Sequence, residues 1–118
     1  NQEWAINAWA LVVVISKKNF TLNGNFSPTH SYDTGAAGQN MALQGYSMNL
    51  IVHAIAGFDF EKAKLALNLS EDFAVESMIA IGRPGKLENL PQHWQEREVL
   101  SDRNAFEKFV HHKKFNNQ

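Results

Sequence analysis

An uninterrupted apolar run, rich in β-branched side chains, constrains the fold of this chain more than any other feature. It covers residues 10–16 and has the sequence Ala-Leu-Val-Val-Val-Ile-Ser. Polar and apolar residues do not alternate in it, which is typical of a strand covered on both faces. We therefore predict a central strand here. The longest unbroken apolar stretch, Trp9 to Ile15, is far shorter than the ~20 residues of a membrane span.

Composition narrows the class of protein. With 118 residues, 44% of them hydrophobic and 19% charged, the chain is expected to form one modest globular domain. A net charge of -1 gives no reason to expect a nucleic-acid or membrane partner. Cysteine is absent, which excludes disulfides and thiolate chemistry. Because no signal peptide is recognisable, we expect a cytoplasmic protein, and a start at Asn1 indicates part of a longer chain.

A long helix is predicted after the first strand. Ser27-Pro28 is a helix start signal, no proline follows before Met48, and Asn49 is suited to a left-handed cap. The helix contains Gly35-Ala36-Ala37-Gly38, where each glycine costs about 1 kcal/mol relative to alanine. We expect such a cost to be tolerated only where another element packs very closely.

Two more strands and a helix are expected in the middle of the chain. Residues 50–55 and 75–81 are short apolar strands, and Asp59 caps a helix over 60–67. A turn at 82–85 ends the third strand.

The last third is predicted to hold one helix. Residues 86–100 show no period and are expected to form an extended arm. Asn104 and Glu107 resemble a capping box, which predicts a closing helix with Phe106, Phe109 and Val110 facing inward. The β-α-β-α-β-α order predicts an α+β layer fold.

Several apparent sites do not meet the requirements of the chemistry they suggest. Gly85-Lys86 lacks the rest of a phosphate-binding loop. His111 and His112 are adjacent, so on a helix they point about 100° apart and do not share a metal easily. We interpret His53 as a core or interface histidine rather than a catalytic base. We predict no metal site and no catalytic acid or base.

A series of short motifs resembles the C-terminal half of the FMN-dependent nitroreductase family. The motifs of this chain that carry the resemblance are Gln39-Asn-Met-Ala-Leu-Gln44 in the glycine-bearing helix, Asn49 followed by a short strand, Gly57-Phe-Asp59, Ile79-Ala-Ile-Gly82 and Arg103. They occur in the family's order and span nearly the whole chain.

The resemblance implies an α+β fold with a mixed or antiparallel sheet flanked by helices, of which residues 1–118 are the C-terminal portion of a single, incomplete domain. It also implies a homodimer with FMN at the subunit interface. Such an enzyme passes two electrons from NAD(P)H through flavin N5 to a nitroaromatic, quinone or similar acceptor.

The resemblance also suggests site residues. Ala54, Ile55, Ala56 and Gly57 match the segment against the isoalloxazine ring, with the Ala56 and Gly57 amides near N5. Arg103 matches an arginine that binds the FMN phosphate, for which a planar guanidinium is suited.

This sequence also departs from the family pattern. An N-terminal Arg-Arg-Ser-x-Arg type phosphate clamp has no counterpart, Ser101 stands where many members have a basic residue, and Ala56 replaces a frequent glutamate. Gly38 stands where related sequences often have an aromatic residue. The alternative function is therefore a non-catalytic flavin-binding or dimerisation module.

Overall fold

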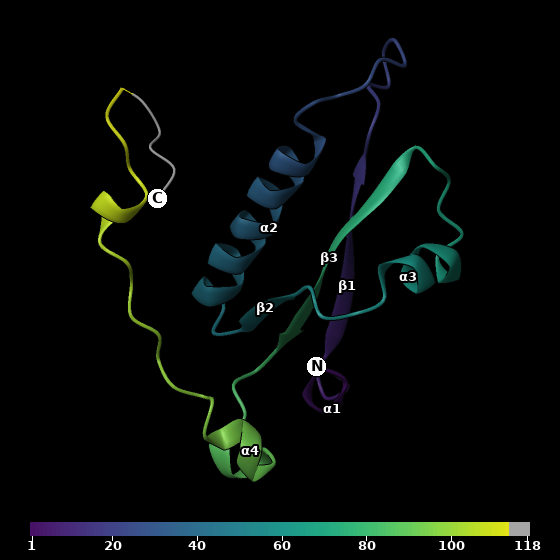
Figure 1. Ribbon diagram of the computed structural model, residues 1–118. Helices are drawn as coiled ribbons and strands as arrows, with labels where there is room; N and C mark the ends of the chain where they lie inside the picture. Colours follow the sequence, from purple (N-terminus) through teal and green to yellow (C-terminus); the bar gives the residue numbers. More distant parts are fainter. Residues whose placement is uncertain (114–118) are drawn as a thin grey trace. The chain divides into compact units, whose positions relative to one another are not determined.

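The computed structural model describes residues 1–113 (Figure 1). The chain divides into two compact units, residues 1–85 and a second that begins at Lys86. Each unit is described by itself below.

The first unit is an α+β layer structure. Its elements are α1 (Gln2–Ala5), β1 (Ala10–Lys17), α2 (His30–Ser47), β2 (Ile51–Ile55), α3 (Phe60–Ala66) and β3 (Phe73–Gly82). The strands form one three-stranded sheet in the order β1-β3-β2, and both pairings are antiparallel. This confirms the predicted fold class.

The central strand is β3, not the predicted 10–16 segment. β1 pairs only with β3, and its residues Leu11 and Ile15 remain exposed on the unit's surface. In β3, Ile79 and Ala80 are only 3% and 4% exposed. An apolar run indicates that a strand is covered, but it does not determine the order of strands. β3 is central although it carries the polar Glu76 and Ser77.

The helix α2 begins later than predicted. Its first residue is His30, whose amide donates to the Ser27 carbonyl at 3.3 Å, and Thr29 is the N-cap residue. Proline 28 therefore precedes the helix instead of opening it. At the other end, Asn49 has a φ of 56°, so the predicted left-handed position is confirmed.

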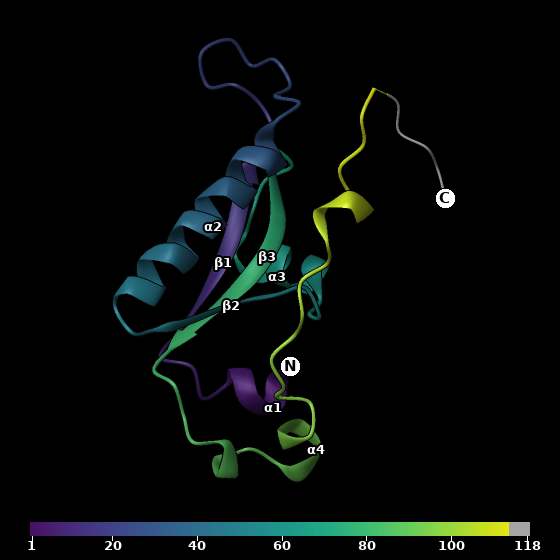
Figure 2. The ribbon, with the colours of Figure 1, turned by 90° about the vertical axis from the view of Figure 1, so that its left-hand side faces the viewer.

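Helices cover both faces of the sheet. Figure 2 shows α2 on one side, with α1 and α3 on the other. The buried cluster of Ala5, Ile55 and Ala80 lies on the α1 side, where Trp4 and Phe58 pack against it. The α3 helix begins as predicted, because Asp59 Oδ1 accepts a hydrogen bond from the Lys62 amide at 2.9 Å.

The glycine that permits close packing of α2 is Gly45. A Cβ atom there would overlap Val52 Cγ2 on β2, and the Gly45 carbonyl accepts from the Leu50 amide at 2.9 Å. By contrast, a Cβ at Gly35 meets nothing within 4 Å, and one at Gly38 meets only Ile79 Cδ1 at 3.9 Å. Within the chain itself, the predicted close approach is therefore at Gly45 rather than at Gly35 and Gly38.

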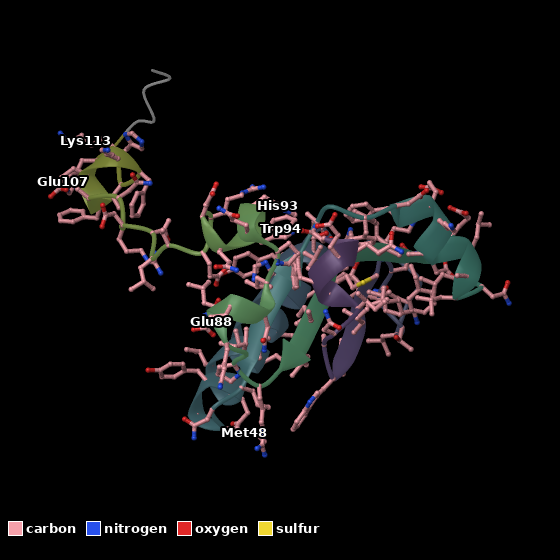
Figure 3. All side chains as sticks on the ribbon, turned by 90° about the horizontal axis from the view of Figure 1, so that it is seen from below. Met48, Glu88, His93, Trp94, Glu107 and Lys113 are labelled. Carbon is pink, nitrogen blue, oxygen red and sulfur yellow. The ribbon has the colours of Figure 1, made fainter. Side chains whose placement is uncertain are left out.

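Over residues 86–113, the second unit has little regular secondary structure. It contains a 3₁₀ turn at Leu87–Asn89 (η1), the short helix α4 (Gln92–Gln95) and a second 3₁₀ turn at Phe106–Lys108 (η2). The helix α4 was not predicted. Figure 3 shows its His93 and Trp94 side chains next to one another, with ring centroids 5.4 Å apart.

The predicted closing helix is wrong over the described residues. Only the turn η2 forms there, and Phe106 and Phe109 are 62% and 63% exposed rather than inward. Val110 is 49% exposed. A helix nucleus is unfavourable without an apolar partner surface, so a capping pattern alone does not produce a helix. His111 and His112 lie in the irregular segment that follows.

Candidate functional site

The predicted site segment forms the end of β2 and the loop that follows it. Ala54 and Ile55 are the last residues of β2 and pair with Ile79 and Met78 of β3. Ile55 is 4% exposed and anchors the strand end in the core, whereas Ala54 is exposed on the α2 side. The loop therefore leaves the sheet from a well-anchored position.

Two successive backbone amides follow the last ladder pair. The ladder ends at Ile55, and among residues 1–113 neither the Ala56 nor the Gly57 amide donates to a backbone carbonyl in the loop contacts. The carbonyls of both residues are used, because Phe58 N donates to Ala56 O at 3.0 Å and Asn1 Nδ2 to Gly57 O at 3.3 Å. Both residues are exposed, so their N–H groups are accessible to a ligand that carries an acceptor atom.

A cavity borders this loop on the α1 side of the sheet. It has a volume of about 350 Å³, and its lining includes Ile55, Gly57, Phe58 and Met78. The Phe58 and Phe60 rings stack beside it with centroids 4.2 Å apart. The loop thus lies next to an apolar recess.

A larger groove separates α2 from the sheet. Its volume is about 460 Å³. Small and polar residues of the helix form one wall, and mainly apolar residues of the strands form the other: Ser31, Thr34, Gly35, Gly38, Gln39 and Ala42 from α2; Val14, Val52, Ala54, Glu76, Ser77 and Ile79 from the sheet. Small residues at α2 positions 35, 38 and 42 are therefore associated with open space and not with tight packing.

A polar cluster lies at one end of this groove. The pairing of β1 with β3 shifts between Val14 and Ile15, which leaves Glu76 unpaired at a β-bulge. Glu76 Oε1 accepts hydrogen bonds from Ser16 Oγ at 2.5 Å and from Ser31 Oγ at 2.7 Å. The cluster joins β1, β3 and the first turn of α2.

The carboxyl of Glu76 is held in its charged form. Partial burial raises its pKa, but the hydrogen bonds from Ser16 and Ser31 and the nearby His30 lower it further, so the pKa lies below its ordinary value. His30 Nδ1 is 3.4 Å from Glu76 Oε1 and 2.8 Å from Ser16 Oγ. Because the single Ser16 hydroxyl proton is donated to Glu76, His30 Nδ1 carries the proton in its contact with Ser16.

Arg103 belongs to the second unit. Its Nη1 donates to the Ser101 carbonyl at 3.1 Å and to Ser101 Oγ at 3.0 Å, and its side chain is exposed. Because the two units are described separately, a shared site of Arg103 with residues 54–57 stays a prediction.

Sequence reasoning missed the Ser16, His30, Ser31 and Glu76 cluster. Its members are up to 60 residues apart, and no spacing rule connects them. A glutamate inside an otherwise apolar strand was the one available signal, since a carboxylate there needs partners. His53 is exposed on β2 and meets the Trp4 ring edge-on at 4.9 Å, so it is not a core histidine.

Membrane-spanning helices and clusters of metal-binding side chains are both absent from the described residues 1–113. No helix in this part of the chain is long and apolar enough to cross a membrane. Over the same residues, no three side chains of the metal-binding kinds gather closely enough to hold an ion.

Comparisons with known proteins give matches among solved structures. No family model and no curated protein sequence matches the chain. An oxidoreductase that contains FMN matches with a TM-score of 0.90 and 31% identity, over 100% of this chain and 61% of the other. A nitroreductase family protein from Clostridium difficile 630 matches with a TM-score of 0.64 and 15% identity, over 92% of this chain and 62% of the other. One from Clostridium novyi NT matches with a TM-score of 0.56 and 22% identity, over 67% and 45%.

These likenesses confirm the predicted fold. The chain has the fold of a part of nitroreductase family proteins, and it spans about three-fifths of the length of the first of these structures.

Proposed function

We propose that this chain, which has the nitroreductase fold, is the C-terminal portion of an FMN-dependent oxidoreductase domain. The observation that carries the proposal is the loop after β2, where Ala56 and Gly57 are exposed residues whose amides make no loop hydrogen bond to a backbone carbonyl within residues 1–113. The likeness to an FMN-containing oxidoreductase at 31% identity supports FMN as the ligand of this loop.

The residues present are suited to a flavin. When bound, FMN would supply two-electron transfer from NAD(P)H to a nitroaromatic, quinone or similar acceptor. Ala54, Ile55, Ala56 and Gly57 would hold its ring system, with the two amides as donors to ring acceptor atoms. Gly57 has no side chain, and the group nearest to its missing Cβ is the flexible Asn1 side chain at 2.6 Å, which can move aside.

Arg103 would hold the phosphate. Its bonds to Ser101 orient the guanidinium, so less conformational freedom is lost when an anion binds. Ser101 thus supports the arginine in place of the second basic residue of many family members. The remaining donors of the guanidinium are then available for a bidentate contact with phosphate oxygens.

Replacement of Arg103 tests this assignment. Arg103→Ala is expected to weaken FMN affinity about tenfold or more, because a charge-assisted hydrogen bond is typically worth about 1.5–3 kcal/mol. Quenching of FMN fluorescence during titration measures the affinity without requiring turnover.

Arg97→Ala is the matched control. Arg97 lies in the same unit and stacks on Trp94, with its guanidinium carbon 5.0 Å from the ring centroid. Its removal is expected to leave FMN affinity unchanged. Equal FMN affinity of Arg103→Ala and the parent protein would show that Arg103 does not hold the phosphate.

A second candidate function is a dimerisation module, either within the enzyme or without turnover. One stripe of α2 exposes large apolar side chains, and its Tyr32, Leu43 and Tyr46 are 79%, 60% and 83% exposed. Leu43→Glu is expected to weaken self-association in sedimentation, because it places a charge on this stripe without touching the sheet. If Leu43→Glu associates with unchanged affinity, α2 is not part of the interface. NAD(P)H oxidation by the FMN-loaded protein distinguishes an enzyme from a non-catalytic module.

We further propose that the enzyme acts in the cytoplasm as a homodimer. A sequence without cysteine suits a reducing compartment and supports the location, and the exposed stripe on α2 supports the homodimer.

A further inference from the structure

The groove between α2 and the sheet has the size and the wall chemistry of a small-molecule site. Its volume of about 460 Å³ lies within the range of about 300–1,000 Å³ that is typical of ligand pockets. Val14, Val52 and Ile79 provide an apolar wall on the sheet side. Gly35 on the helix side leaves open space, because a Cβ atom placed on this residue would meet nothing within 4 Å.

One charged side chain of this groove is held by contacts with three neighbouring residues. Glu76 lines the groove, and its three contacts with Ser16, Ser31 and His30 all use the Oε1 atom. Among residues 1–113, no hydrogen bond uses Oε2. Since no fully buried polar side-chain atom in this part of the chain lacks a partner, the unbonded Oε2 is not fully buried, and it belongs to a residue that lines the groove.

Among residues 1–113, no lysine or arginine forms an ion pair with Glu76. His30 is the titratable group of α2 that faces it, and Ser16 of β1 is neutral. The basic side chain nearest along β1, Lys17, bonds Thr21 instead. An accessible carboxylate oxygen beside an apolar wall is complementary to a positive group attached to an apolar body.

We propose that the groove between α2 and the sheet binds a small organic amine, with its ammonium group on Glu76 Oε2 and its flat apolar body against Val14, Val52 and Ile79. The proposal does not depend on the flavin chemistry. Ala54 is the one residue that lines the groove and also belongs to the proposed FMN segment, and the FMN donors Ala56 and Gly57 lie outside the groove.

Tryptamine is the probe for this site, because it joins a flat indole ring to a primary ammonium. Tryptophol carries the same ring with a neutral hydroxyl, and indole-3-propionate carries it with a negative charge. Binding is measured on the full chain by the shifts of backbone amide signals in two-dimensional NMR spectra. We expect tryptamine to bind about tenfold or more tightly than tryptophol, with shifts at Val52 and Ile79, and indole-3-propionate not to bind.

Three variants locate the site. Glu76→Gln keeps an acceptor for the two serines but removes the charge, so the preference for tryptamine over tryptophol is expected to disappear. Gly35→Leu keeps Glu76 and fills the groove from the helix side, so both ligands are expected to lose binding. Glu71→Gln is the matched control, because Glu71 is an exposed partner of Lys64 at 2.7 Å and does not line the groove.

Either of two results would overturn the proposal. Equal affinity for tryptamine and tryptophol in the parent chain would show that Glu76 does not select an ammonium. Undiminished tryptamine binding by Gly35→Leu would show that the amine binds elsewhere. Because Gly35→Leu leaves the Glu76 cluster intact and improves helix propensity, its outcome does not depend on whether Glu76→Gln folds.

Discussion

Replacement of Gly45 tests how α2 is held against the sheet. In Gly45→Ala, the new methyl group overlaps Val52 Cγ2, lies 3.6 Å from Val52 Cβ and is 3.9 Å from Leu50 Cβ. The nearest atom belongs to a β-branched side chain with restricted χ1, so the overlap is relieved only by a change of rotamer or by movement of the helix end. Overpacking of this kind costs about 1–3 kcal/mol.

Gly35→Ala provides the matched comparison. It is in the same helix, and its new methyl group meets nothing within 4 Å. Both substitutions gain about 1 kcal/mol of helix propensity at most, and only Gly45→Ala has the overlap. We therefore expect Gly35→Ala to be neutral or stabilising, and Gly45→Ala to be less stable than Gly35→Ala by about 1–3 kcal/mol.

Urea unfolding followed by far-ultraviolet circular dichroism measures both differences. The double variant Gly45→Ala with Val52→Ala removes the overlapping methyl groups, so its loss of stability is expected to be smaller than the sum of the single losses. If Gly45→Ala were as stable as Gly35→Ala, the close approach of α2 to β2 at Gly45 would be refuted.

Two further predictions concern hydrogen bonds made by carboxylates. Asp59→Ala removes the acceptor of the Lys62 amide and is expected to lower the free energy of unfolding by about 1 kcal/mol. Asp59→Asn keeps an acceptor oxygen and is expected to retain most of the stability of the parent chain. Urea unfolding of the two variants measures this difference. The folded-state pKa of Glu76 lies below its ordinary value, so its stabilising effect is present above that value and is lost as the pH falls through the folded-state pKa. Unfolding curves at pH 7 and at pH 3 are therefore expected to differ less for Glu76→Gln than for the parent chain. An equal acid loss in both proteins would contradict the Glu76 contacts. Glu71→Gln is expected to have little effect, because the Glu71 pair with Lys64 is exposed.

The local elements of the first unit were largely predictable from the sequence. Strands, the long helix, the Asp59 cap and the left-handed Asn49 depend on signals within a few residues, and the structure contains all of them. The resemblance to nitroreductases gave the fold because its motifs preserve the order of these elements. The segment 54–57, which we propose as the flavin site, lies at the end of a strand as the motif order implies.

Features that depend on distant partners were not predictable. The order β1-β3-β2 depends on which strands pair. The residues next to Val12 or Ile79 in the sequence do not specify the partner of either strand. The Glu76 bulge requires a comparison of two strands, and Gly45 matters only because Val52 lies beside it. The predicted closing helix does not form over the described residues, where its apolar side chains Phe106, Phe109 and Val110 remain exposed instead of packing against a partner surface.

Amide-resolved NMR during titration with FMN tests the central claim most directly. We predict that the Ala56 and Gly57 amide signals shift more than those of Gly24 and Gly85, which lie in other loops of the first unit. Those shifts report hydrogen bonds to the bound ring and do not require turnover. FMN binding that leaves the Ala56 and Gly57 signals unmoved would contradict the assignment of the loop after β2 as the flavin site.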